Sequence, residues 1–395
     1  MKIAGIVAEY NPFHNGHRWQ IEATRAAGAS HIVAVMSGCY VQRGEPALWD
    51  KWLRTRAALL GGVDLVVELP LPYATATAQR FAYGGVTLLN ALGVVDMLSF
   101  GSELGETQPL VTAARALLDP ELERLIPQLM GDGRTFAAAR QQAVEVLYGQ
   151  STAQLLQSPN NILGVEYIYW LLRTGSHIQP FTVARQGGGH DSRGLGQFSS
   201  ASALRPMVVE QGYQGLEGLV PNARVFIDAC REGCCYDPAA LERPMLAALR
   251  SMSRKQLAEL PDISEGLENR IRQAVKTAET VEGLLEAVKT KRYPHARLRR
   301  ILLAAWLGIP AGLTAQPPPY IRVLGMNRRG QEVLSLAKKR AILPMSHSAA
   351  RLQQLGARES KFISLEARAD DLYGVVCGRI QPCGRTYTQP IISLE

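Results

Sequence analysis

Residues 2–17 of the chain read KIAGIVAEYNPFHNGH, and this stretch decides the fold. Residues 2–8 form a short apolar run that is typical of a buried β-strand. An amphipathic stretch over 16–27 follows and is typical of a helix. His14 lies just before this stretch, and Gly16 and His17 are its first two residues. The order of strand, loop and helix predicts that the chain opens with the first part of a βαβ unit.

The same alternation continues over the first 185 residues. Apolar runs predict further strands over 31–36, 63–69, 94–100 and 178–185, and helical patterns separate them. Such units build a parallel sheet covered by helices on both faces, and ligands bind beyond the carboxyl ends of its strands. We therefore expect an α/β fold with a Rossmann-like parallel sheet, and chemistry in the loops that follow residues 8, 36, 69 and 100.

Three segments are expected along the chain. Residues 1–210 hold the predicted sheet and the histidine motif, and are expected to form a catalytic nucleotide-binding domain. Residues 211–315 read mainly as consecutive helices and are expected to form a basic helical domain. A proline run at 317–319 then marks a stiff break, and residues 316–395 read as a mixed α/β segment.

The loop and the first helical turn have the chemistry of a phosphate site. A helix N-terminus presents unpaired N–H groups and a partial positive charge, which suit an anion. Two imidazoles on that turn can donate to phosphate oxygens and offset the charge that grows on them in a transition state. Gly16 allows close approach of a nucleotide, and Pro12 fixes the turn. The alternative is a helix start that binds nothing, but the whole string after an N-terminal strand favours a nucleotide site.

Two further segments fit this interpretation. Gly101 and Ser102 follow the predicted strand over 94–100, where backbone groups could contact a nucleoside. Ser200 and Arg205 lie in the stretch SSASALR at 199–205, where a serine-rich helix start and an arginine could hold outer phosphates. The alternatives are an ordinary strand-to-helix turn, a plain N-cap and a solvated arginine.

These motifs resemble the His-x-Gly-His and Ile-Ser-Ser-Thr-x-Ile-Arg signatures of the nucleotidyltransferase superfamily. Together with PNNILG at 159–164, they resemble the tRNA(Met) cytidine acetate ligase family over the whole chain. The resemblance implies catalytic roles for His14 and His17. It implies ATP contacts from Val7, Ala8, Glu9, Tyr10, Asn11, Pro12, Phe13, His14, Asn15, Gly16, His17, Arg18, Trp19, Gln20, Gly101, Asn160, Asn161, Arg185, Ser200 and Arg205. It leaves open which of the two asparagines contacts ATP.

The resemblance also implies a reaction and its partners. Members of the family activate acetate with ATP to form acetyl-adenylate, and then acetylate N4 of the wobble cytidine in the anticodon loop of elongator tRNA(Met). Magnesium is expected to accompany ATP. No acidic metal cluster stands out in the sequence, so ATP binding without a metal ion stays open, and no residue is assigned as a metal ligand. The sequence does not identify the acetate pocket or the oligomeric state.

Charge is divided unevenly between the two halves of the chain. The formal net charge is +8, and residues 1–190 hold 14 Lys and Arg against 15 Asp and Glu, so the excess lies after residue 190. One cluster, within which Tyr293 also lies, is a candidate tRNA-binding surface: Lys289, Lys291, Arg292, Arg297, Arg299 and Arg300. Arg328, Arg329, Lys338, Lys339 and Arg340 form a second cluster. A solvated helix face is the alternative for either cluster, and their position outside the ATP motif favours RNA.

The remaining features set the cellular context. No apolar stretch is long enough to span a membrane, and no signal peptide is recognisable, so we expect a cytoplasmic protein without a membrane partner. Six cysteines are too few for a disulfide framework and lack zinc-ligand spacing, so we expect reduced thiols, including Cys230, Cys234 and Cys235. Two other functions stay open: an adenylyl- or cytidylyltransferase acting on a small phosphorylated substrate, and an RNA-binding protein that senses a nucleotide.

Overall fold

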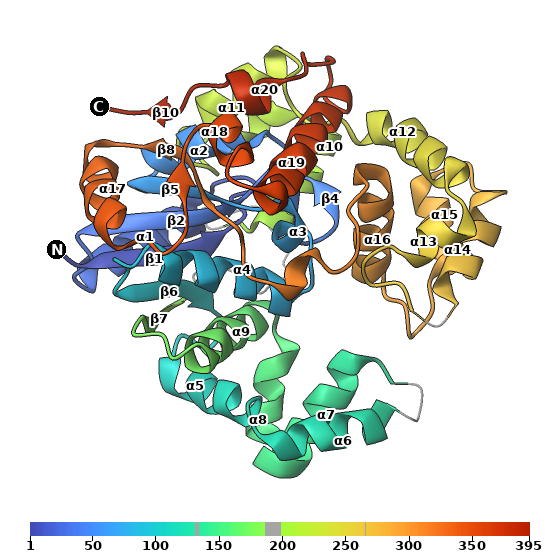
Figure 1. The fold of residues 1–395 in the computed structure, drawn as a ribbon, viewed down its shortest axis with the longest axis horizontal. Coiled ribbons are helices and arrows are strands. Elements are labelled where there is room, and N and C mark those ends of the chain that lie inside the picture. The colour runs from blue at the N-terminus through green and yellow to red at the C-terminus, as the bar shows by residue number, and fades with distance from the viewer. Residues whose placement is uncertain (131–133, 186–198, 265) are drawn as a thin grey trace.

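A central sheet organises the chain (Figure 1). The computed structural model describes residues 1–130, 134–185, 199–264 and 266–395. Among these, eight strands form the sheet in the order β10-β8-β5-β2-β1-β6-β7, with β9 paired to β8. The strands are β1 (Ile3–Ala8), β2 (His31–Ser37), β5 (Leu65–Leu69), β6 (Met97–Ser102), β7 (Gln179–Ala184), β8 (Ile321–Met326), β9 (Met345–Ser346) and β10 (Ile392–Ser393).

The strands predicted from the apolar runs are confirmed as β1, β2, β5, β6 and β7, and they pair in parallel. In the register of the two central strands, Ile3 lies opposite His31 and Ala8 opposite Met36. β8 lies antiparallel to β5, and β9 and β10 are parallel to β8. The α/β fold class is therefore confirmed, and the segment 316–395 extends the same sheet with strands of opposite direction.

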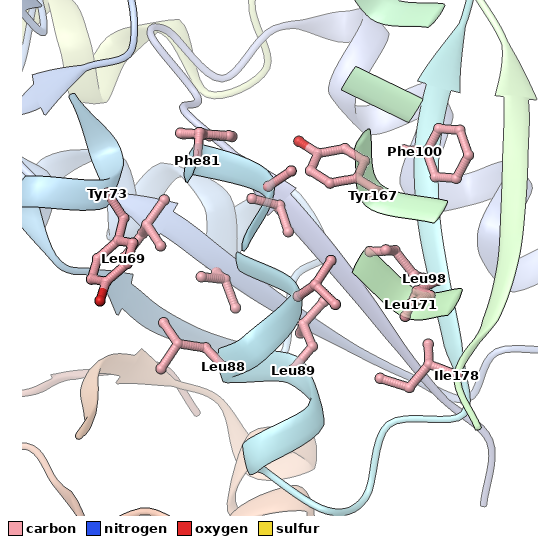
Figure 2. Close-up of a cluster of buried hydrophobic side chains, with 14 of the residues drawn as sticks. Leu69, Tyr73, Phe81, Leu88, Leu89, Leu98, Phe100, Tyr167, Leu171 and Ile178 are labelled. Carbon is pink, nitrogen blue, oxygen red and sulfur yellow. The ribbon is translucent and has the colours of Figure 1, made fainter. Parts of the chain in front are cut away.

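Helices cover both faces of the sheet, so β1, β2 and β5 are buried on both sides. On one face lie α1 (Asn15–Ala26) and α2 (Lys51–Leu60), whose buried side chains pack on Ala4 and Ile6. The other face is covered by α4 (Ala78–Ala91) and α9 (Pro159–Arg173). Figure 2 shows Leu88 and Leu89 of α4 and Leu171 of α9 packed with side chains of the sheet.

A glycine allows α4 to lie close to β1. A Cβ atom at Gly5 would lie 2.6 Å from the Cδ2 atom of Leu89, closer than any real carbon contact. The absence of a side chain at this position therefore sets the distance between the first strand and the helix that covers it. Both elements carry residues of the site described below.

The other helices form smaller groups around this core. Helices α5 to α8 form an extension below β7 in Figure 1, and α10 and α11 pack on the face that carries α1 and α2. Helices α12 to α16 have a hydrophobic core of their own and lie on the right in Figure 1. Their bounds, and those of the remaining helices, are α3 (Leu71–Ala74), α5 (Thr107–Ala116), α6 (Pro120–Met130), α7 (Phe136–Tyr148), α8 (Gln150–Gln154), α10 (Ala201–Gln211), α11 (Ala223–Arg231), α12 (Pro238–Ser251), α13 (Arg254–Ala258), α14 (Leu267–Val275), α15 (Val281–Val288), α16 (His295–Leu307), α17 (Arg328–Arg340), α18 (Ala349–Gln353), α19 (Ala357–Val375) and α20 (Arg385–Thr388).

A short hairpin joins the sheet to the helical group. It follows β2 and consists of β3 (Tyr40–Val41) and β4 (Glu45–Pro46), with residues 42–44 at its tip. Gly44 has φ +81°, and a Cβ atom there would lie 2.5 Å from the backbone nitrogen of Arg300 in α16. Only glycine fits both this left-handed backbone and this close approach. The hairpin tip is therefore packed directly against the backbone of α16 at Arg299 and Arg300.

The C-terminal segment is joined to the sheet by buried charges. Lys51 in α2 is fully buried, and its Nζ atom lies 2.5 Å from Oε1 of Glu68 in β5 and 2.6 Å from Oδ2 of Asp370 in α19. Arg322 in β8 donates to the second carboxylate oxygen of Glu68 at 2.9 Å. These ion pairs connect an early helix, a central strand and two elements more than 250 residues later in the chain.

Among the described helices, none combines the length and the apolar character that a membrane span requires.

Candidate active site

A cavity of about 410 Å³ opens at the carboxyl ends of β1, β6 and β7. This is the edge at which parallel sheets place their ligands, and the volume lies in the range of small-molecule sites. Most of the predicted ATP residues line it: Val7, Ala8, Glu9, Tyr10, Asn11, His14, Gly16, His17, Trp19, Gln20, Gly101, Asn160, Arg185, Ser200 and Arg205. Residues from five separate stretches of the first 205 positions therefore meet in one cavity.

The two histidines hold each other and the first turn of α1 in a capping box. His14 is the N-cap, and its Nδ1 atom accepts a hydrogen bond from the backbone N–H of Gly16 at 3.0 Å. The Nδ1 atom of His17 accepts from the backbone N–H of His14 at 3.2 Å. The two rings stack with their centroids 3.7 Å apart. Because each Nδ1 atom accepts a backbone N–H, the proton of each neutral ring lies on Nε2.

Both imidazoles are neutral in the free protein. Burial lowers the pKa of His14 to about 3, with smaller contributions from the positive charges of Arg185 and Arg205. Burial also lowers the pKa of His17 well below its usual value, and His14 and Arg185 act in the same direction. The site therefore offers two Nε2–H donors side by side at a helix N-terminus, which is a suitable arrangement for phosphate oxygens.

The serine and arginine of the second motif also face this cavity. Ser200 is the N-cap of α10, and its hydroxyl oxygen accepts from the backbone N–H of Ala203 at 3.3 Å. Arg205 donates to the backbone oxygen of Asn11 at 3.3 Å, and its Nε atom lies 3.4 Å from Oε1 of Glu45. The arginine is thus held against the first loop by residues far away in sequence, and its side chain is only 15% exposed.

The two asparagines at the start of α9 have different positions. Asn160 lines the cavity and donates to Oε1 of Glu103 at 2.6 Å. Asn161 is buried, and its side-chain oxygen accepts from the backbone N–H groups of Glu103 and Leu104. Asn161 therefore fixes the loop after β6, the strand that contains Gly101, while Asn160 faces the ligand space.

Four members of the predicted ATP segment do not line the cavity. Phe13 is fully buried and contacts Gly61, where a Cβ atom would lie 2.3 Å from its ring. Pro12 is buried in the loop, and Asn15 donates from its side chain to the backbone oxygen of Gly218. Arg18 is exposed and pairs with Glu22 one helical turn later. These residues shape the loop and the helix rather than the ligand surface.

The cavity wall also contains residues that none of the motifs predicts, among them Gln42, Arg43, Ala78, Phe81 and Tyr167. Gln42 and Arg43 lie in the β3–β4 hairpin, and Ala78 and Phe81 lie at the start of α4. The expectation that chemistry lies in the loops after residues 36 and 69 pointed to these regions, but the residue types there form no recognisable motif.

The candidate tRNA-binding residues differ in how far their side chains are available. Lys289, Lys291 and Arg292 are exposed around the end of α15. Arg297 donates to the backbone oxygen of Asp262 at 2.8 Å. In α16, Arg300 lies 3.2 Å from the carboxylate of Asp262, and Arg299 lies 3.5 Å from that of Glu282. The last three therefore also stabilise the helical group.

The second basic cluster lies on α17, at the left of Figure 1 and on the opposite side of the view from α12–α16. Its members Arg328, Arg329, Lys338, Lys339 and Arg340 are exposed. The two clusters of the sequence therefore lie on elements at opposite sides of this view, and only the first belongs to the helical group that contacts the hairpin of the cavity wall.

The cysteines and the acidic residues differ in their fitness for a metal ion. All six cysteines are free thiols. Among the described residues, the one group whose ligand atoms could surround a metal ion is Glu282, Glu286 and His295, which lies on the helical group. His295 pairs there with Glu286 at 3.0 Å. This group is remote in sequence from the residues of the cavity and is explained by ion pairing.

Comparisons with known proteins agree with the motif. The family model described as HIGH Nucleotidyl Transferase matches residues 1–386. A tRNA(Met) cytidine acetate ligase of a Thermoanaerobacter species is 39% identical over the full length of both chains. The enzyme of the same name from Caldanaerobacter subterraneus subsp. tengcongensis is 38% identical, again over both full lengths.

Solved structures give the same result. The crystal structure of Thermotoga maritima TmcAL bound with alpha-thio ATP matches all of this chain with a TM-score of 0.92 and 32% identity. The apo form of that protein matches with a TM-score of 0.94. The agreement covers the whole sheet, the helical group and the C-terminal segment. The chain therefore belongs to the HIGH nucleotidyl transferase family, among the relatives of the tRNA(Met) cytidine acetate ligases.

Proposed function

We propose that this protein is an ATP-dependent acetate ligase that forms acetyl-adenylate and acetylates N4 of the wobble cytidine of elongator tRNA(Met). The observation that carries the proposal is the pair of neutral imidazoles, His14 and His17, at a helix N-terminus that opens into a cavity with Arg185 and Arg205. The names of the full-length relatives support acetate as the acyl donor and tRNA(Met) as the acceptor. The ATP analogue bound to the Thermotoga protein supports ATP as the nucleotide substrate.

The first step joins acetate to AMP. A carboxylate oxygen of acetate attacks the α-phosphorus of ATP, the bond to the β-phosphate breaks, and pyrophosphate leaves with the electron pair. No covalent enzyme intermediate is needed, so positioning and charge neutralisation carry the catalysis. The Nε2–H groups of His14 and His17 and the N–H groups of the first turn of α1 stabilise charge on the phosphate oxygens. Arg205 neutralises the outgoing pyrophosphate.

Magnesium would reach this site on the phosphates of ATP rather than on protein ligands. Among the described residues that line the cavity, Glu9 is the one carboxylate, and it already accepts a backbone hydrogen bond. Magnesium prefers oxygen ligands from carboxylates together with substrate phosphates. Because the lining residues provide no carboxylate cluster, no step of the mechanism is assigned to a metal ion.

The second step transfers the acetyl group to RNA. The N4 amine of cytidine attacks the acetyl carbonyl carbon, the bond to the phosphate oxygen breaks, AMP leaves, and one N4 proton is released. The target base lies in an anticodon loop and is already unpaired, so its extrusion into the cavity costs little. The exposed residues Lys289, Lys291 and Arg292 provide a phosphate-binding surface on the helical group.

The proposed function is tested by incubating the protein with ATP, labelled acetate and bulk bacterial tRNA, followed by digestion and nucleoside analysis. We expect labelled N4-acetylcytidine that requires both ATP and tRNA. Adenylate transfer to a small phosphorylated substrate, without acetylcytidine, would instead indicate a simple nucleotidyltransferase. A folded sample that yields no acetylcytidine contradicts the proposal.

The RNA surface has its own test. Replacing Lys289, Lys291 and Arg292 together by glutamine should weaken tRNA binding and lower the slope of log Kd against log salt by about 2 to 3, since each phosphate contact contributes about 0.7 to 0.9. The matched control replaces Arg328, Arg329 and Lys338 of the second cluster, on α17. An unchanged salt slope in the first variant shows a solvated face that does not contact RNA.

A further inference from the structure

Part of the cavity wall is not accounted for by the ATP motifs. The residues matched to those motifs come from β1, α1, β6, β7, α9 and α10. The wall also contains Gln42 and Arg43 from the hairpin after β2, and Phe81 at the start of α4. In the sheet, β2 lies on the side of β1 opposite to β6 and β7. A nucleotide that extends from β1 over β6 and β7 therefore leaves the hairpin side of the cavity for the second substrate.

Glu9 stands at the boundary between these two parts and its carboxylate is fixed in place. Its Oε1 atom accepts the backbone N–H of Gln42 at 2.8 Å. Its backbone oxygen accepts from the buried guanidinium of Arg54, which also donates to the backbone oxygen of Ser37 at the end of β2. The carboxylate is therefore held by the hairpin, and the backbone beneath it is held by α2.

Arg43 lies in the hairpin between the carboxylate of Glu9 and the helical group α12–α16, on which the proposed RNA-binding residues lie. It lies at the tip of the hairpin, next to Gly44, whose close contact with Arg300 fixes the tip against α16. Arg43 is among the residues that line the cavity, and its positive charge acts on Glu9. A base that arrives from the helical group thus meets the hairpin tip as it enters the cavity.

We propose that Glu9 and Arg43 form the subsite that binds the target cytosine, an inference that rests on the proposed function. The pairing edge of cytosine presents one donor, the N4 amine, followed by two acceptors, N3 and O2. A carboxylate beside a guanidinium matches this order: Glu9 accepts an N4 hydrogen and Arg43 donates to N3 and O2. Uracil presents a carbonyl oxygen at position 4 and an N–H at position 3, so the same pair repels it. Phe81 lines the same cavity and adds an apolar side chain to its wall.

The arrangement also provides a proton acceptor for the transfer step. The N4 lone pair attacks the acetyl carbon, and the C–O bond to AMP breaks with its electron pair on the phosphate. The N4 proton passes to the carboxylate of Glu9, which later releases it to solvent. No further reactant is needed, because acetyl-adenylate supplies the acyl group and the leaving group.

The environment of Glu9 makes its carboxylate a stronger base than a free one. Burial raises its pKa above the usual value for a carboxyl group. The Gln42 N–H, Arg205 and Arg43 oppose this shift, and Glu45 adds to it. Because a base acts only when deprotonated, the transfer rate should rise with pH through this raised pKa and then level off.

The test separates the two half-reactions. Acetate-dependent exchange of labelled pyrophosphate into ATP reports adenylate formation, and acetylcytidine formed from added acetyl-adenylate and saturating tRNA reports transfer. Arg43→Ala should slow transfer about 10- to 100-fold more than it slows exchange, the size expected for a bidentate base contact. Arg43→Lys should recover little, because lysine lacks the planar pair of donors. Arg56→Ala, an exposed arginine of α2, is the matched control.

Glu9→Gln supplies an independent measurement, since glutamine keeps an oxygen that can accept the Gln42 N–H. Transfer by this variant should lose the rise with pH that the unmodified protein shows. Equal losses of exchange and transfer in Arg43→Ala would place Arg43 at ATP, pyrophosphate or acetate and overturn the inference, as would transfer at the normal rate. If the unmodified protein forms acetyl-adenylate but no acetylcytidine, the proposed function fails and the inference falls with it.

Discussion

Replacing His17 by alanine is expected to lower acetate-dependent ATP–pyrophosphate exchange by about 10²- to 10³-fold, the usual cost of removing one donor that stabilises transition-state charge. The physical reason is the fixed tautomer of the ring. Because the Nδ1 atom of His17 accepts the backbone N–H of His14, its Nε2–H is the group available to a phosphate oxygen. Alanine removes that donor and leaves the N–H of His14 without its acceptor.

The effect on stability must be measured separately. Loss of a capping interaction costs about 0.5 to 2 kcal/mol, so the variant should remain folded. Binding of tRNA should change little, since the exposed basic residues lie on another group of helices. His177→Ala is the matched control, because that exposed histidine does not line the cavity. Exchange by His17→Ala within threefold of the unmodified protein would contradict the assigned role.

The second large effect concerns stability. Replacing the buried Lys51 by methionine is expected to lower the free energy of unfolding by about 3 to 5 kcal/mol at pH 7, because it leaves buried carboxylates without their cation. Lys51 contacts Glu68 at 2.5 Å and Asp370 at 2.6 Å, and none of the three side chains is more than 2% exposed. The measurement is guanidinium denaturation, with the exposed Lys276→Met as the control, which should change stability by no more than about 0.5 kcal/mol.

The stability lost in Lys51→Met should depend on pH. Burial, with the nearby charge of Glu68, raises the pKa of Glu366 to about 8, and Lys51 opposes that rise. A carboxyl group whose pKa is raised in the folded state contributes stability below its unfolded pKa and loses it as pH rises through the folded value. The loss caused by Lys51→Met should therefore be smaller at pH 5 than at pH 8. A uniform loss over this range, or a loss below about 1 kcal/mol, would contradict the role assigned to the lysine.

The sequence by itself was sufficient wherever the determining interactions are local. The strands β1, β2, β5, β6 and β7 could be predicted because each one is itself a run of mainly apolar residues. The capping box of His14 and His17 lies within one helical turn, so the motif predicts both the helix start and its chemistry. The resemblance carried by three motifs gave the family that the full-length comparisons show.

Other parts of the site depend on packing between segments that are distant in sequence. Asn160 and Asn161 are identical neighbours, and the direction of α9 decides that the first faces the cavity and the second supports the loop after β6. Arg297 and Arg300 count as basic residues in the sequence, yet their contacts with Asp262 hold the helical group together.

The tertiary structure alone decided which residues form the hairpin side of the cavity. Arg43 belongs to no motif, and it reaches the site because Gly44 packs on α16, more than 250 residues later. β8 pairs with β5 in the sheet, and Arg322 of β8 donates there to Glu68, 254 residues earlier in the chain. Such contacts depend on complementary surfaces that exist only when the chain is folded. A local pattern could therefore determine where the nucleotide chemistry begins, and the folded structure determined which side chains surround it.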